Sequence, residues 1–221
     1  MRYSPEHKAE THSRIVRKAS VRLREKGAHG VGVADLMKEA GLTHGGFYAH
    51  FASREALVIE AFGDAMDRST ERWRKTLAEL APEKRIPAIV DSYLTAQHRD
   101  DIGHGCAVPA LGAEIARESP RTRKAFAAKL EAMVGLFAEN IPDVSPKVAR
   151  KRASAMLATL MGTLVMARIA GSGEFSEDIL DAGRLAALAC ASGASEASKS
   201  AAKPIARKRP ASRAAPAAAR R

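Results

Sequence analysis

Cysteine, aromatic residues and long apolar runs are all scarce in this 221-residue chain. Its two cysteines, Cys106 and Cys190, stand in no metal or redox spacing, which argues against a disulfide framework and fits a reducing compartment. Aromatic residues make up only 5% of the chain and alanine is abundant, a balance that favours close-packed helices over a sheet. We therefore expect an all-α fold.

No apolar run approaches the roughly 18 residues that a membrane-spanning helix needs. The longest candidate, residues 153–170, is interrupted by Ser154, Thr159, Thr163 and Arg168. The first twenty residues are polar and charged, unlike a signal peptide. The sequence therefore predicts a soluble, cytoplasmic protein with no membrane partner.

Catalytic patterns are absent from the sequence as well. It contains no phosphate-binding loop, no paired carboxylates and no nucleophile–base arrangement, so we expect neither an enzyme nor a bound cofactor. His98, His104 and Cys106 could be grouped as a metal site, but their spacing matches no standard one and we expect no metal.

Positive charge, in contrast, is abundant and unevenly placed. The formal net charge of +11 suggests a polyanionic partner. Residues 193–221 account for +7 of it, in a stretch of Ala, Ser, Lys, Arg and Pro without periodicity that we predict to be a disordered basic tail. This tail is either simply solvated or adds salt-sensitive, sequence-independent affinity for DNA. An architectural, nucleoid-type protein that acts through this tail is an alternative function.

Residues 33–54 carry the most informative pattern. Leu36, Met37 and Ala40 fall at helical spacing, and Gly41 can close that helix in a left-handed conformation. Thr43 then stands where an N-cap would begin a second helix. Two short helices joined by about three or four residues with glycine in the turn are typical of a helix-turn-helix, whose second helix lies in the DNA major groove.

At these residues the chain resembles the TetR/AcrR family of one-component transcriptional repressors, most strongly over residues 9–62. The matching elements are an apolar-patterned helix before the motif, Gly41-Leu42-Thr43, and the run Phe47-Tyr48-Ala49-His50-Phe51 followed by Ser53-Arg54-Glu55-Ala56-Leu57. One departure is that Gly32 and Val33 stand where the family usually has Ser or Thr in contact with a phosphate.

The resemblance implies a homodimeric repressor that binds a palindromic operator in double-stranded DNA and is released by a small-molecule ligand or a thiol-reactive signal. We expect a three-helix DNA-binding domain over residues 1–55, a larger helical ligand-sensing and dimerisation domain over 56–192, and the tail over 193–221. The stretch 155–166 is apolar nearly all round, so its helix must be buried on both sides. We expect a second copy to cover it, with the last two helices forming the dimer contact.

Apolar periodicity and the turn signals between segments predict the individual helices. The predicted ranges are 6–26, 33–40, 44–50, 54–80, 86–97, 107–117, 120–140, 146–170 and 177–191, with a polar loop over 98–105 and Ser176 as the cap of the last helix.

The expected DNA contacts are Ala34, Lys38, Thr43, His44, Gly45, Gly46, Tyr48, His50 and Arg54. Residues 43–46 would form the N-terminal turn of the recognition helix, which reaches base edges. Lys38 and Arg54 are candidates for phosphate contacts, and the resemblance places Tyr48, His50 and Arg54 at positions that grip the DNA backbone. The alternative is that the aromatic run is only core. For the two phenylalanines we favour a position in the core. For Tyr48 and His50 we favour DNA contact, because side chains that only fill a core need no polar group at their ends.

The expected sensing residues are Cys106, Tyr93, His104, Met133, Phe137 and Met161. Ordinary core packing is the alternative for the apolar ones. Cys106 follows His104-Gly105 at a loop-to-helix junction, where the helix N-terminus would lower the pKa of its thiol. Some electrophile-responsive repressors that resemble this chain sense through such a cysteine, while the alternative is a small buried apolar residue.

Overall fold

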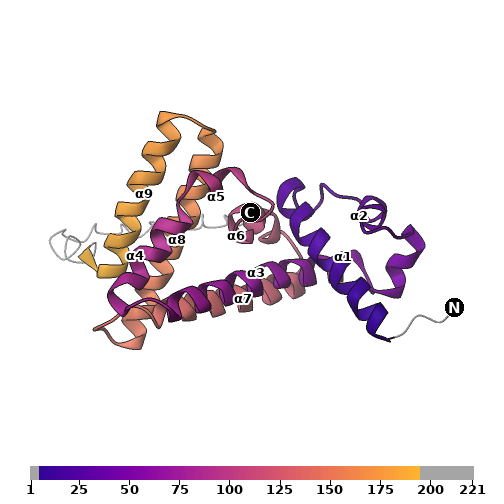
Figure 1. Ribbon diagram of the computed structural model, residues 1–221, viewed down its shortest axis with the longest axis horizontal. Helices are drawn as coiled ribbons and strands as arrows, with labels where there is room; N and C mark the ends of the chain where they lie inside the picture. Colours follow the sequence, from indigo (N-terminus) through magenta and orange to yellow (C-terminus); the bar gives the residue numbers. More distant parts are fainter. Residues whose placement is uncertain (1–4, 195–221) are drawn as a thin grey trace, which may run out of the picture.

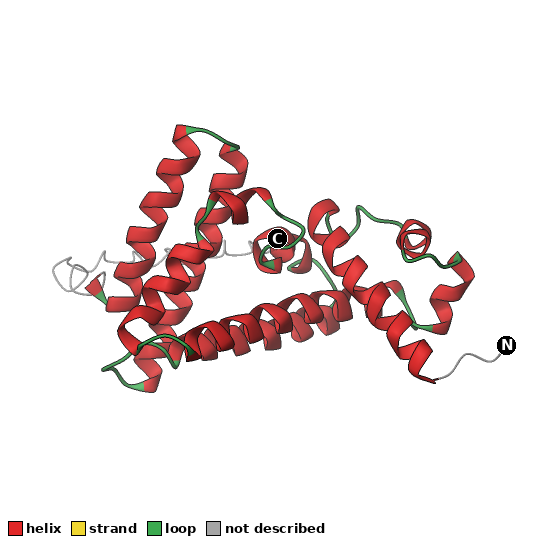
Figure 2. Cartoon of the chain, in the orientation of Figure 1, coloured by secondary structure: helices red, strands yellow, loops and turns green. Residues whose placement is uncertain are grey.

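The computed structural model describes residues 5–194, and these residues form helices and loops with no strand among them (Figure 1, Figure 2). The predicted tail lies outside the described residues from Ser195 onward. In chain order the elements are α1 (Pro5–Lys26), α2 (Val33–Glu39), the 3₁₀ helix η1 (His44–Ala49), α3 (Arg54–Ala78), α4 (Pro82–Tyr93), α5 (Ala96–Asp100), α6 (Ala107–Ile115), α7 (Pro120–Ala138), α8 (Pro146–Ala170) and α9 (Glu174–Ser192).

The reading head consists of α1, α2, η1 and the first turn of α3. Gly27 ends α1 and Gly41 ends α2, both with the positive φ that glycine adopts without strain. Phe47 and Phe51 are buried in the centre of the head and stack with their ring centroids 5.4 Å apart. The prediction that these two phenylalanines form core is therefore confirmed.

The sensor body consists of the rest of α3 and the helices α4 to α9. Helix α3 runs from the head along α7, so the two regions share one continuous helix (Figure 1). Ser53 caps its start by accepting a 3.1 Å hydrogen bond from the Ala56 N–H. The expected boundary at residue 55 thus falls in the first turn of an unbroken helix.

Helices α8 and α9 form a closely packed pair at the end of the body far from the head (Figure 1). Gly183 of α9 lies so close to α8 that a Cβ atom there would come within 2.2 Å of the Thr163 side chain. By length and composition, α8 could cross a membrane, contrary to the expectation from its polar interruptions. One face of α8 packs into the protein core, where Met156, Leu160 and Leu164 are fully buried.

Three helix predictions need correction. The helix expected over 86–97 is two helices, because Pro82 starts α4 and Thr95 caps a separate α5, which takes up part of the expected loop. The recognition segment is a 3₁₀ helix. The last helix begins at Glu174, so Ser176 lies inside it rather than at its cap.

Candidate DNA-reading surface and sensor cleft

The turn that would meet base edges is open to solvent. Thr43, His44 and Gly45 are exposed, Gly46 is half-buried, and Tyr48 is 69% exposed while its neighbour Phe47 is fully covered. A Cβ atom at Gly45 would touch nothing within 4 Å, so the backbone there is free for close approach. The structure thus separates the polar and small residues of this segment, which face outward, from the apolar residues that hold it in place.

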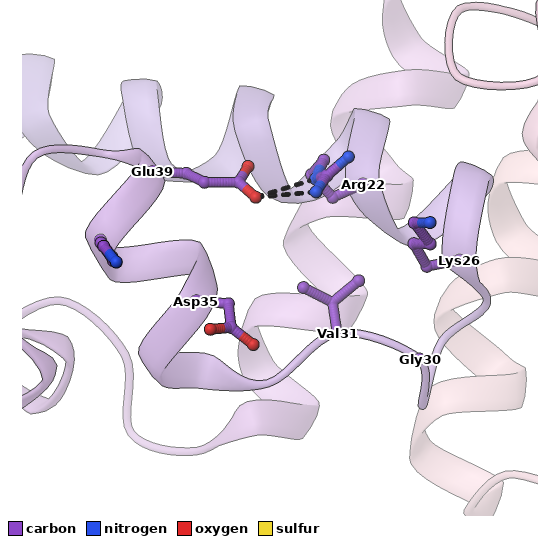
Figure 3. A pocket seen from close by; sticks show the side chains of 7 residues that line it. Arg22, Lys26, Gly30, Val31, Asp35 and Glu39 are labelled. Atoms are coloured by element: carbon purple, nitrogen blue, oxygen red, sulfur yellow. Dashed lines mark hydrogen bonds and ion pairs between the residues drawn. The ribbon is translucent and has the colours of Figure 1, made fainter.

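Two further residues of the expected interface, Ala34 and Lys38, are exposed on α2. Lys38 borders a shallow hollow between α1 and α2, which Figure 3 shows from close by. Arg22 and Glu39 form a 2.9 Å ion pair across it, so the hollow holds both signs of charge. Gly32 begins α2 without a side-chain cap, so no side-chain oxygen at this position accepts from the first N–H groups of the helix.

His50 is half-buried, in contrast to its neighbour Tyr48. Its ring lies 6.0 Å from the His12 ring, and its buried Nδ1 has no hydrogen-bond partner among residues 5–194. Burial, and then the neighbouring His12 and Lys8, lower the pKa of His50. It is therefore a neutral group at neutral pH.

Arg54 makes hydrogen bonds within the protein that its position in the sequence did not suggest. Its guanidinium donates hydrogen bonds to the backbone carbonyls of Ala28 and Val31, the second at 3.4 Å. These carbonyls lie in the loop between α1 and α2, and the Ala28 N–H in turn donates to Glu114 at 2.7 Å. Arg54 thus supports the loop that orients α2, and its direct contact with a DNA phosphate stays a prediction.

A cleft of about 560 Å³ lies between α1, α3 and the segment from α4 to the start of α6. Of the six expected sensing residues, Tyr93, His104 and Cys106 line it. Met133 and Phe137 do not, because they are fully buried in the core, where Trp73 packs edge-on against Phe137. Met161 is half-buried on α8 away from the cleft. The lining that the sequence did not reveal is mainly polar and cationic: Arg17, Arg24, Arg68, Arg72 and His98.

Cys106 stands at the N-cap of α6, as expected, but its environment is not that of a reactive thiol. The residue is 6% exposed, and burial raises the pKa of the thiol. Tyr93 and the backbone at Val108 lower that pKa, but by less than burial raises it. The prediction of a lowered pKa is therefore wrong, because desolvation outweighs the helix N-terminus.

His98 ties the cleft wall together. Its Nδ1 lies 2.6 Å from the Tyr93 carbonyl oxygen, and its Nε2 accepts a 2.8 Å hydrogen bond from the Cys106 N–H. Nε2 is therefore unprotonated, and burial lowers the pKa of the ring. Since both ring nitrogens are engaged, the geometry does not fit a metal site built from His98, His104 and Cys106.

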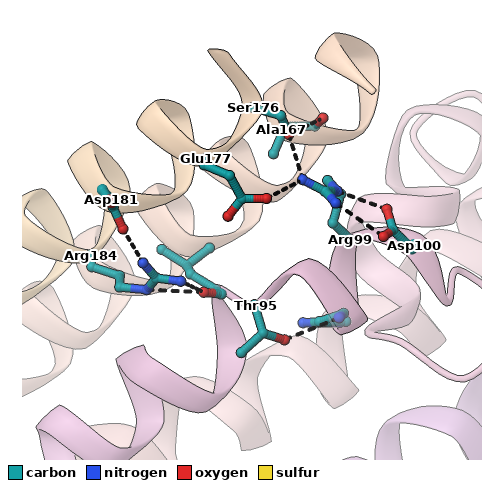
Figure 4. A network of polar contacts seen from close by, with 10 residues as sticks. Thr95, Arg99, Asp100, Ala167, Ser176, Glu177, Asp181 and Arg184 are labelled. Carbon is teal, nitrogen blue, oxygen red and sulfur yellow. Dashed lines mark hydrogen bonds and ion pairs between the residues drawn. The ribbon is translucent and has the colours of Figure 1, made fainter. Parts of the chain in front are cut away.

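A network of arginines fastens this wall to the last two helices (Figure 4). Buried Arg99 of α5 donates to Ser176 at 3.0 Å and to Glu177 at 2.7 Å, both on α9. Ser176 donates in turn to the Ala167 carbonyl of α8, and Arg184 of α9 donates to the Leu94 carbonyl. The corner between α4 and α5 therefore cannot move without disturbing α8 and α9.

The chain matches known protein families and individual relatives. The chain matches the family model for bacterial regulatory proteins of the tetR family over residues 15–61, and the model for the LmrA/YxaF-like C-terminal domain over residues 82–182. An uncharacterised HTH-type transcriptional regulator of Mycobacterium tuberculosis is 27% identical over 164 residues, which cover 71% of this chain and 83% of that protein. CymR of Pseudomonas putida, also an HTH-type regulator, is 35% identical over 85 residues, or 38% of this chain and 42% of its own length.

Solved structures share the fold. NemR of E. coli in its reduced form aligns with a TM-score of 0.67 and 23% identity over 79% of this chain and 95% of that chain. FadR of Bacillus subtilis in complex with stearoyl-CoA aligns with a TM-score of 0.63 and 16% identity over 82% and 98%. With an exposed helix-turn-helix, a helical body and both family models in agreement, the chain belongs to the TetR family of DNA-binding transcriptional regulators, which are not enzymes.

Proposed function

We propose that this protein is a homodimeric repressor that leaves its palindromic operator when a small molecule occupies the cleft. The observation that carries the proposal is that α1, a helix of the reading head, also lines the cleft. One side of α1 packs in the reading head, while its residues Arg17, Val21 and Arg24 form a wall of the cleft. A ligand in the cleft would therefore touch the head directly and change its orientation.

For the DNA contact, we propose that Thr43, His44, Gly45 and Tyr48 meet the major groove and nearby phosphates. Their exposure supports this assignment. We propose Lys38, Ala34 and Gly46 for the rim of the contact, with His50 behind the reading turn and Arg54 supporting the loop between α1 and α2. We propose the basic tail of residues 193–221 as a source of additional, salt-sensitive DNA affinity.

For the dimer, we propose a contact through α8 and α9. Four large apolar side chains are exposed on or near these two helices: Met166, Ile169, Phe175 and Leu185. Exposed apolar side chains in such number on one helix pair mark a surface that a partner covers. We place the dimer in the cytoplasm, with residues 56–192 serving sensing and dimerisation.

For the signal, the geometry favours a bound ligand over a thiol-reactive one. The cleft is large enough for a small organic molecule. FadR, which shares the fold, was solved with stearoyl-CoA. The buried, protonated Cys106 speaks against a fast thiol reaction. We expect N-ethylmaleimide at neutral pH to modify half-buried Cys190 before Cys106, as read by mass spectrometry. Faster labelling of Cys106, with loss of DNA binding that Cys106→Ser prevents, would support the thiol signal instead.

Footprinting on a DNA sequence selected from a random pool, together with light scattering, tests the proposed function. We expect one short palindrome to be protected at moderate salt by a particle of two chains. Uniform coating that disappears as salt rises would contradict the repressor and favour the architectural alternative.

A further inference from the structure

The cleft between head and body carries an unbalanced positive charge. Arg17 and Arg24 reach it from α1 and Arg68 and Arg72 from α3, whereas Asp101 is the one acidic residue in its lining. Arg68 is paired with Asp64 at 2.6 Å. Arg17 and Arg72 form no ion pair within the described chain, and both are exposed to the cleft solvent.

Arg24 shows that this charge reaches the interior. It is 6% exposed and donates to the Gly103 carbonyl at 2.7 Å and to the Ser20 hydroxyl at 3.1 Å. Both partners are neutral, and no carboxylate forms an ion pair with Arg24 in the part of the chain that the structure describes. Burial and then the charge of Arg68 on the facing wall lower the pKa of Arg24, while Cys106, Asp64 and Asp101 raise it by less.

Two buried donors beside the cleft lack a nitrogen or oxygen acceptor among the described residues, and one of them, the Tyr93 hydroxyl, has only the weakly accepting sulfur of Cys106 as a partner. The Tyr93 hydroxyl is next to the thiol of Cys106, but within residues 5–194 no nitrogen or oxygen bonds to it, and the residue is 3% exposed. Arg168 lies beside Tyr93 and Cys106. It donates to the carbonyls of Arg99 and His98, yet its Nη1 is buried without a described partner. Buried donors are rarely left unpaired, so such a pair points to a missing acceptor.

Part of the remaining lining is apolar, beside polar residues such as Ser69, Thr76 and Gln97. Trp73, Val21 and Ala65 contribute to the apolar part together with the Tyr93 ring. A molecule that fits this cleft therefore needs an acidic group for the arginines and the orphan donors, and an aromatic or aliphatic body for the apolar part.

We propose that the cleft binds a small organic anion with an apolar body, and that its acidic group bridges the arginines of α1 and α3. This inference rests on the proposed ligand-controlled function and names the class of its ligand. By neutralising the cations of both walls, the anion would let α1 approach α3 and would shift the reading head. A neutral molecule of the same shape would leave the repulsion in place.

Two probes with the same rings separate charge from shape: 8-anilinonaphthalene-1-sulfonate and the uncharged N-phenyl-1-naphthylamine. The single tryptophan, Trp73, lines the cleft, so energy transfer from it to the bound probe reports binding at this place. We expect the full-length protein to bind the sulfonate about tenfold more tightly than the neutral probe. Equal affinities would overturn the proposal.

Arg17→Gln on α1 and Arg72→Gln on α3 each remove one cation that the acidic group of the ligand would contact. Because both side chains are exposed, we expect both variants to fold. We expect each to weaken sulfonate binding about three- to fivefold and the neutral probe not at all. Arg74→Gln is the matched control, since Arg74 lies on α3 outside the cleft and pairs with Glu71. Unchanged sulfonate affinity in the double variant would overturn the anion site.

Measuring operator binding with the same proteins distinguishes the proposed anion site from the proposed ligand-controlled release of the operator. If the sulfonate binds through Arg17 and Arg72 but the operator complex persists, the anion site stands and ligand-controlled release fails. If the operator is bound and a neutral compound alone releases it, repression stands and the anionic class is overturned.

Discussion

The reading head and the sensor body solve the same packing problem differently. The head holds short elements together with large side chains, Phe47 and Phe51 at its centre, and with Arg54 across its loop. The body also buries large side chains such as Phe137, but it joins its long helices α8 and α9 through small residues, as at Gly183 against Thr163. Between them, the cleft contains polar groups that neither side satisfies. The difference suggests a rigid reader attached to a body that is completed by its ligand.

The largest effect should come from Phe47→Ala compared with Tyr48→Ala. Phe47 is 1% exposed, so its truncation should lower the free energy of unfolding by about 3–5 kcal/mol. Tyr48→Ala should change it by less than about 0.5 kcal/mol while weakening operator binding. Urea unfolding and a DNA-binding titration measure both quantities. A similar loss of stability in the two variants would remove the distinction between core and reading surface within this segment.

The sequence predicted the head well for a physical reason: its signals are local. Gly41, the apolar spacing of α2 and the aromatic run all lie within residues 33–54 and act over one or two turns. The cleft was not predictable in this way, because Arg24 and Arg68 are brought together only by packing. The same holds for Arg99 and Ser176, and for the burial that reverses the expected pKa of Cys106.

Gly183→Ala should have the next largest effect on stability. It tests whether the sensor body depends on the close approach of α8 and α9. The new Cβ would overlap Thr163, so we expect the free energy of unfolding to fall by about 1–3 kcal/mol. Thr163→Ala, which removes the nearest atoms, should restore part of this loss in the double variant. Thermal melting of the four proteins measures the coupling, and strictly additive losses would argue against tight packing at this contact.

Arg54→Lys should have a smaller effect and decide between support and phosphate contact. Lysine keeps the charge, but its shorter side chain lacks the planar guanidinium whose Nη2 donates both hydrogen bonds. We expect a loss of about 1–2 kcal/mol in the free energy of unfolding as the carbonyls of Ala28 and Val31 lose their partner. If Arg54→Lys leaves the free energy of unfolding unchanged but weakens DNA binding, then Arg54 contacts the DNA.

The smallest effect should be the pH dependence that His98 gives the cleft wall. Its pKa in the folded protein is below the ordinary 6.5, so the unfolded chain binds the proton more readily. The stability from this residue is complete above pH 6.5 and is lost as the pH falls from 6.5 towards the folded pKa. Urea unfolding at several pH values between 7.5 and 5 measures how the free energy of unfolding changes with pH. This change with pH should be less steep for His98→Gln than for the unaltered protein. Parallel slopes would contradict the assignment.

The continuity of α3 turns a small rotation into a large displacement. Its 25 residues rise about 1.5 Å each, which gives an arm of roughly 37 Å with the cleft along its second half and the reading turn beyond its first residue. A tilt of about 5° would move the far end by roughly 3 Å, the length of a hydrogen bond. In a dimer whose heads must meet grooves about 34 Å apart, such a swing in both arms is enough to lose the match with the DNA.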